Sequence, residues 1–140
     1  MRPVGGEPEF SRDLTGWCQV RVRSNGEVLG SRVRICRSFL SRLRGLMFRR
    51  SLSPGEGALL ILGGESRWDA TIHMFFVFFP IAVFWLDRQG IVVSRKVARP
   101  WRPFYAPLRA AQYVLELEQG AIGRANEGEP LELHAILEMG

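Results

Sequence analysis

The chain has 140 residues and a mass of 15.9 kDa, the size of one domain, with 46% hydrophobic and 24% charged residues. These values exclude a globally disordered chain, and the length allows a hydrophobic core without disulfides or metals. The net charge is +5, but residues 1–50 carry +7 and residues 51–140 carry −2. Such a basic half indicates either a solvated arginine surface or an anionic partner.

Residues 1–14 are rich in proline, glycine and charge, which predicts a flexible N-terminal arm before a single globular domain over residues 15–140. No apolar leader segment is visible, so we expect a cytoplasmic location. The apolar run over residues 70–86 contains His73 and Pro80 and is short for a membrane helix, so we expect no membrane span.

Residues 17–35 predict a β-hairpin with a two-residue type I′ turn at Asn25-Gly26. That turn pairs Val20 with Ser31 and leaves one face of the hairpin largely apolar, because side chains alternate along a strand. The opposite face would carry a candidate basic patch made of four arginines, Arg21, Arg23, Arg32 and Arg34.

The two cysteines are Cys18 and Cys36, which the same register places on opposite faces. Without a CxxC motif or a Cys/His cluster they do not form a metal site, and we interpret them as reduced core thiols. The sequence also lacks a phosphate-binding loop, a dinucleotide fingerprint and a serine nucleophile motif, so we predict no metal and no cofactor.

Ser38 is an N-cap candidate for a short amphipathic helix over residues 38–50, which a turn at residues 53–57 follows. The remaining apolar runs predict strands over residues 58–62, 71–79, 81–86, 91–97, 113–117 and 131–137, of which the run at 71–79 is one strand or a pair of short ones. We therefore predict an α+β, mainly β domain: a curled antiparallel sheet or small open barrel with one or two short helices.

An ordered set of short motifs then suggests a family. They are Arg44–Arg49, Gly57–Leu60, Ile72–Phe76, Phe79–Ile81, Val83–Asp87 with Gly90, Pro100-Trp101, and Tyr113–Leu117 with Gly120. Their order resembles that of domain-of-unknown-function family 192, over about residues 28–133. The family is a small, largely β fold without an agreed activity, so the resemblance implies fold rather than function. Ala82 and Val77 depart from the Asp and Met that many members carry there.

Four residues form the candidate binding site that we favour, an aromatic-lined loop cluster of Trp68, His73, Trp101 and Tyr105. The same aromatics could instead cover the end of a small barrel. His73 could act as a general base with Asp69 or Asp87, although a single histidine in an apolar segment is more often structural.

Three classes of function remain at this stage. We favour a non-enzymatic module that binds a small ligand or a protein partner through the aromatic loops. A nucleic-acid-binding protein using the arginine face is the first alternative. An enzyme with a site centred on His73 is the second, and the sequence names no reaction for it.

Overall fold

The structure, a computed structural model, describes residues 8–12, 14–38, 41–42 and 45–136. Its elements are seven strands, joined by loops, and two short 3₁₀ turns. The elements in chain order are η1 (Glu9–Ser11), β1 (Trp17–Val22), β2 (Val28–Cys36), β3 (Glu56–Ser66), β4 (Ile81–Leu86), β5 (Val92–Ala98), β6 (Ala111–Glu118), η2 (Gln119–Ala121) and β7 (Leu131–Ala135).

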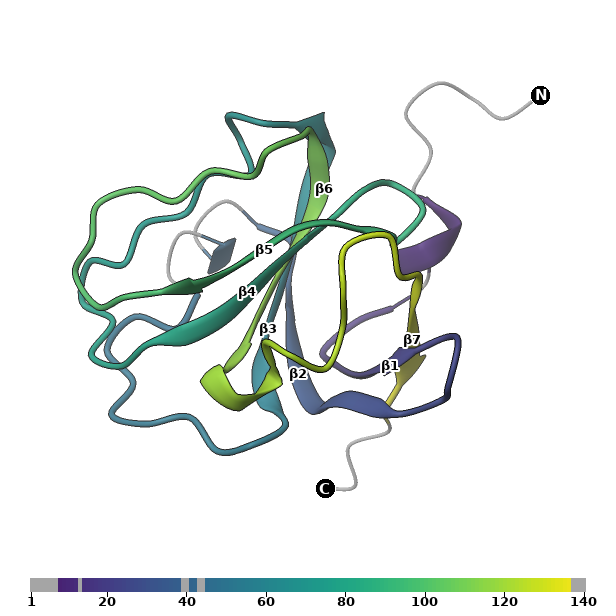
Figure 1. The fold of residues 1–140 in the computed structure, drawn as a ribbon, viewed down its shortest axis with the longest axis horizontal. Coiled ribbons are helices and arrows are strands. Elements are labelled where there is room, and N and C mark those ends of the chain that lie inside the picture. Colours follow the sequence, from purple (N-terminus) through teal and green to yellow (C-terminus); the bar gives the residue numbers. More distant parts are fainter. Residues whose placement is uncertain (1–7, 13, 39–40, 43–44, 137–140) are drawn as a thin grey trace.

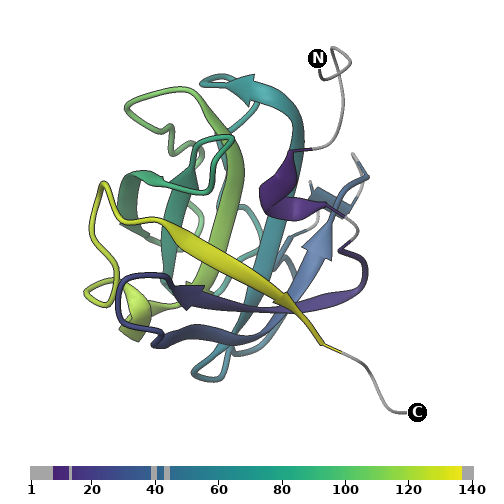
Figure 2. The ribbon, with the colours of Figure 1, turned by 90° about the vertical axis from the view of Figure 1, so that its right-hand side faces the viewer.

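All seven strands belong to one sheet, in the order β5-β4-β6-β3-β2-β1-β7. Every neighbouring pair is antiparallel except β2 and β3, which are parallel and are joined by the long crossover that parallel pairing requires. The sheet is strongly curled, and long loops extend from it on the side away from β1 and β7 (Figures 1 and 2). The predicted mainly β, curled-sheet fold class is therefore confirmed.

Two hydrophobic clusters cover the two faces of the sheet. The inner cluster is built almost entirely from strand residues, among them Val20, Phe84 and Leu115. The outer cluster joins strand residues such as Trp85 to loop residues such as Met74. Because both faces are covered, all six residues of β4 are buried.

The indole of Trp85 ties the outer loops to the sheet. Its Nε1–H donates a hydrogen bond of 2.7 Å to the carbonyl of Ala70, and both residues are fully buried. The predicted strand over residues 71–79 is wrong, since this segment forms only an isolated bridge from Ile72 to Tyr105. Its backbone bonds to the 101–105 loop instead, and Phe76 has the left-handed φ of 60° that breaks a strand.

The hairpin over β1 and β2 has a longer turn than predicted. Within the described chain, Gly26 has a positive φ (72°) but Asn25 does not, so the type I′ turn, which needs both, does not form. Val20 consequently pairs with Gly30 rather than Ser31, with bulges on either side.

The helix expected over residues 38–50 is much shorter. Ser38 does cap it, because its hydroxyl accepts from the Ser41 N–H at 3.1 Å, and Arg42 and Gly45 donate to carbonyls four residues earlier. Gly45, at φ 43°, then ends the helical turn, because it has the left-handed conformation of a helix C-terminus. Residues 39–40 and 43–44 of the expected helix lie outside the described residues.

Part of the expected N-terminal arm is packed onto the domain. Phe10 meets Tyr113 edge-on with ring centroids 4.9 Å apart, and the Ser11 hydroxyl lies 2.9 Å from the Tyr113 hydroxyl. Both cysteines are free and buried, Cys18 in the inner cluster and Cys36 in the outer one. Burial raises the pKa of Cys18 to about 12, so it is a neutral core thiol. The described residues contain no helix long and apolar enough to span a membrane.

Candidate functional site

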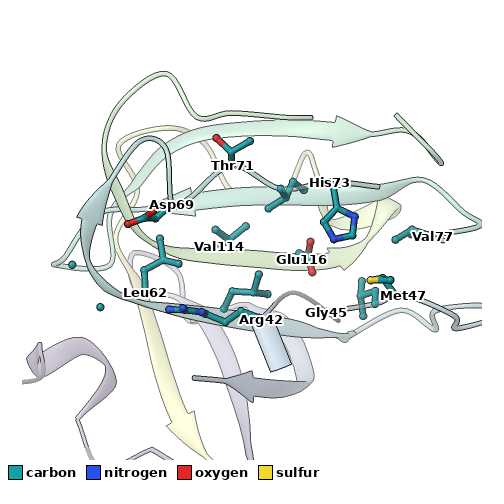
Figure 3. Close-up of a pocket in the computed structure, with 15 residues that line it drawn as sticks. Arg42, Gly45, Met47, Leu62, Asp69, Thr71, His73, Val77, Val114 and Glu116 are labelled. Atoms are coloured by element: carbon teal, nitrogen blue, oxygen red, sulfur yellow. The ribbon is translucent and has the colours of Figure 1, made fainter. Parts of the chain in front are cut away.

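A pocket of about 510 Å³ opens on the loop-covered face of the sheet (Figure 3). Its walls come from β3, β6, the turn at residues 45–47 and the loop at residues 69–77. The apolar lining residues are Leu46, Met47, Leu60, Leu62, Ile72, Val77 and Val114. The lining side chains with polar or charged groups are Arg42, Asp69, Thr71, His73 and Glu116.

Glu116 is the polar residue at the centre of the pocket. It lies in β6, where alternation turns Leu115 and Leu117 to the inner cluster and Glu116 to the outer face. It is 5% exposed, and its Oε1 atom has no hydrogen-bond partner among the described residues. Burial raises the pKa of Glu116 to about 7, against the opposing effect of the Arg34 guanidinium.

Gly45 lets the chain approach this carboxylate closely. Its carbonyl accepts a 2.7 Å hydrogen bond from the Arg34 guanidinium, which fixes the turn beside β2. A Cβ atom at this position would lie 3.0 Å from Glu116 Oε1. Arg34, Gly45 and Glu116 therefore form one packed unit at the base of the pocket, and glycine is the residue that fits there.

The other polar groups are spread along the pocket. Arg42 and Asp69 lie toward one end, and His73 lies toward the other with Met47 (Figure 3). Arg42 donates to the Ile61 carbonyl at 3.1 Å. The Phe75 N–H donates to His73 Nδ1 at 3.2 Å, so a neutral His73 carries its hydrogen on Nε2.

A group of exposed aromatic side chains, which we call the aromatic rim, includes the chain neighbours of pocket residues Met47 and Val77. The ring of Phe76 lies 5.0 Å from those of both Phe48 and Trp101, and Trp101 lies 5.8 Å from Phe78. The rim consists of Phe48, Phe76, Phe78 and Trp101, each between 42% and 57% exposed.

Three rim residues have strained backbones. Phe48, Phe76 and Trp101 have φ values of 65°, 60° and 65°, and among the described residues no other non-glycine residue has a positive φ. Bulky residues in this region cost roughly 1–3 kcal/mol each, and such strain gathers at functional sites. The strain and the exposure of apolar rings thus coincide on one surface.

The four residues of the predicted binding cluster are separated in the structure. His73 lines the pocket, and Trp101 belongs to the aromatic rim. Tyr105 is buried in the outer cluster, where its hydroxyl accepts from the Arg99 N–H at 2.8 Å. Trp68 is 84% exposed and does not line the pocket.

The arginines of the predicted basic patch each have partners within the chain. Arg21 donates to Gln19, Arg23 pairs with Glu132 at 3.3 Å, and Arg32 lies 4.4 Å from the ring centre of Trp17. Arg34 points instead to the base of the pocket. The patch remains a prediction, and within it the Glu132 carboxylate offsets the charge of Arg23.

Sequence reasoning missed the role of Glu116. The available signal was a single carboxylate inside the otherwise apolar run at residues 113–117, because a charged residue in a strand buried on both faces needs a reason to be there. No group of three or more His, Cys, Asp or Glu side chains that could hold a metal occurs in the described parts of the chain.

Comparison with protein families finds one that covers most of the chain. The DUF192 model, described as "Uncharacterized ACR", matches residues 20–132. A "UPF0127 protein" of Thermococcus sibiricus is 40% identical over 74% of this chain and 66% of its own length. A second, from Thermococcus kodakarensis, is 38% identical over 71% of this chain and 61% of its own length. The chain therefore spans less than two thirds of these curated relatives.

Two solved structures share the fold. A "putative transcription regulator" from Sinorhizobium meliloti has a TM-score of 0.73 at 23% identity, covering 84% of this chain and 92% of its own. A protein of unknown function from Novosphingobium aromaticivorans has a TM-score of 0.70 at 21% identity, covering 83% of each chain. At these identities the likeness extends to the fold alone.

Proposed function

The chain belongs to the uncharacterised DUF192 family, and from this premise we propose that it is a binding domain for a small organic ligand in the pocket above Glu116. The observation that carries the proposal is Glu116, which lines the pocket, is 5% exposed, and has an Oε1 atom without a hydrogen-bond partner among the described residues. A carboxyl group buried without its donors is unfavourable, which supports an N–H group of a ligand as its partner.

The rest of the pocket favours a compact apolar body on that ligand. Leucine, valine and methionine side chains form its walls, and its volume of about 510 Å³ is in the range of small-molecule sites. The aromatic rim, next in the chain to Met47 and Val77, would contact the part of the ligand that extends out of the pocket. The proposed ligand class is thus an amine, amidine or amide attached to a ring or a short aliphatic chain.

A set of three matched fragments tests this proposal. Benzamidine and benzamide both present N–H donors on a flat apolar ring, whereas benzoate presents only acceptors. We expect benzamidine to bind best, since its cation would pair with the Glu116 carboxylate, and benzoate not to bind. Chemical-shift changes of backbone amides around the pocket would give the affinities.

Variants identify the contact. Glu116→Leu removes the acceptor and should weaken benzamidine at least tenfold, about 1.4 kcal/mol. Glu127→Gln, on an exposed turn, is the matched control and should leave binding unchanged. Equal binding of all three fragments, or equal affinity in wild type and Glu116→Leu, would contradict the proposal.

Catalysis is a second candidate, favoured by one observation. His73 and Glu116 line the same pocket, and burial shifts the pKa of Glu116 to about 7, where a proton can be given or taken. Native mass spectrometry of gently purified protein would detect a retained ligand. If that ligand keeps its mass after incubation with fresh protein, the domain binds it; a changed mass that requires His73 would show turnover.

A further inference from the structure

A second depression, separate from the Glu116 pocket, lies beside the end of β5 and the loop at residues 99–108. It measures about 450 Å³, and four of the residues that line it are cationic. No Asp or Glu is among its lining residues. The lining residues that matter here are Arg67, Lys96, Arg99, Arg102, Phe104 and Leu108, which we call the cationic groove.

The charge of the groove comes from a one-sided stretch of sequence. From Arg88 through Gln112 the chain has five arginines, Arg88 included, and Lys96, and it has no Asp or Glu. The net charge of residues 51–140 is nevertheless −2, because acidic residues elsewhere in this part of the chain outnumber its basic residues. A concave surface lined by one sign of charge concentrates anions.

The cations of the groove are not neutralised by carboxylates. Arg67 donates to the Pro107 carbonyl at 2.9 Å, and the Arg102 guanidinium lies 5.1 Å from the ring centre of Tyr105. Within the described residues, neither of these arginines forms a salt bridge, and neither do Lys96 and Arg99. Arg23, which directly follows β1, differs because it is paired with Glu132 at 3.3 Å.

The loop that carries Arg99 and Arg102 is braced by prolines and hydrogen bonds. Prolines at positions 100, 103 and 107 restrict its backbone, and the Tyr105 hydroxyl accepts from the Arg99 N–H. Tyr105 also exchanges two backbone hydrogen bonds of 2.9 Å with Ile72. On this loop Phe104 is 69% exposed, and it lines the same groove as Arg102.

We propose that the cationic groove binds single-stranded nucleic acid, with phosphates on its arginines and lysine and a base stacked on Phe104. Exposed rings among cations fit a strand whose bases are unstacked, whereas a duplex or a free phosphate would make no use of Phe104. The site differs from the predicted Arg21, Arg23, Arg32 and Arg34 patch and does not depend on the ligand of the Glu116 pocket.

Fluorescence anisotropy with labelled oligo-dT of about 12 nucleotides, at about 50 to 300 mM salt, tests the proposal. Arg99→Gln with Arg102→Gln should weaken binding at least tenfold. It should also reduce the magnitude of the slope of log affinity against log salt concentration by about 1.4, the value for two phosphate contacts with a single strand. Phe104→Ala should weaken binding about five- to tenfold without changing the slope, because it removes stacking alone. Arg21→Gln with Arg23→Gln is the control and should bind as wild type.

Several outcomes would overturn the proposal. These are no binding at micromolar protein in the lowest salt, equal losses in the groove and control variants, or no effect of Phe104→Ala. Equal binding of a duplex, or binding of phosphatidylglycerol vesicles without oligonucleotide, would assign the groove to another partner. Lys96→Gln with Arg99→Gln repeats the test without touching the Arg102–Tyr105 contact, and circular dichroism confirms that each variant is folded.

Discussion

The two faces of the sheet are built in different ways. The inner face is covered almost entirely by strand residues, and its cluster consists mainly of aliphatic and aromatic side chains that pack against one another. The outer face is covered by loops, and it holds the pocket, the strained aromatic rim and the Glu116 Oε1 atom, which has no hydrogen-bond partner among the described residues. One strand, β6, supplies both faces, with Leu115 on the first and Glu116 on the second. The scaffold and the candidate site are thus separated by a single strand.

The largest expected difference between the two faces is in the stability lost when one phenylalanine on each face is truncated. Phe84 is fully buried in the inner cluster, so Phe84→Ala should lower the free energy of unfolding by about 3–5 kcal/mol. Phe78 is half exposed on the aromatic rim, so Phe78→Ala should change it by less than about 1 kcal/mol. Guanidinium unfolding would measure both, and similar losses would show that the rim is part of the core.

The next largest effect concerns pH. Because the pKa of Glu116 is raised to about 7, the folded protein keeps a proton that the unfolded chain, with a usual pKa of 4.5, has already lost. The stabilisation is complete below about pH 4.5 and disappears as the pH rises through 7. Relative to Glu116→Gln, wild type should lose on the order of 3 kcal/mol between about pH 4 and 8.

Urea unfolding of both proteins across this pH range would provide the measurement. Glu127→Gln, on the surface, should track wild type at every pH. If the free energies of unfolding of wild type and Glu116→Gln differed by the same amount at every pH, the Glu116 carboxylate would be solvated. The outer face would then not differ from the inner face in holding a buried carboxyl group.

A smaller change should loosen the outer face alone. Trp85→Phe keeps an aromatic ring but leaves the buried Ala70 carbonyl without its donor, at a cost of about 1–3 kcal/mol. Faster hydrogen exchange should appear in residues 66–80 while β1 and β2 remain protected. Trp17→Phe, on the partly buried β1, serves as the control, and uniform exchange in both variants would indicate that the loops are not a separate layer.

The sequence predicted the strands well because their signal is local. The bounds of β4 are those expected, and β5 and β6 differ from prediction by one or two residues at each end. β3 extends past its expected end at Leu62, because Gly63 and Gly64 stay in the strand, which continues to Ser66. Alternation and β-branched content are properties of neighbouring residues, so they survive without knowledge of the fold.

The outer face was less predictable because its structure depends on distant partners. The apolar segment at residues 71–79 looks like a strand, but its hydrogen bonds go to a loop some thirty residues later in the chain. Phe48 and Phe76 meet only through that arrangement, and their positive φ values run against residue preference. The candidate cluster was therefore divided, with His73 lining the pocket, Trp101 in the aromatic rim, Tyr105 in the outer cluster and Trp68 exposed.

The pairing of β1 with β7 has a mechanical consequence. Cys18 lies opposite Ala135 and Val22 opposite Leu131, so the start of the first strand and the end of the last are neighbours at one end of an antiparallel ladder. A pulling force applied through these two ends would load the hydrogen bonds of the ladder one after another, rather than all together as in shear. If it were held taut between two attachments, the domain would yield at low force, and β7 would peel away while the rest of the sheet stayed intact.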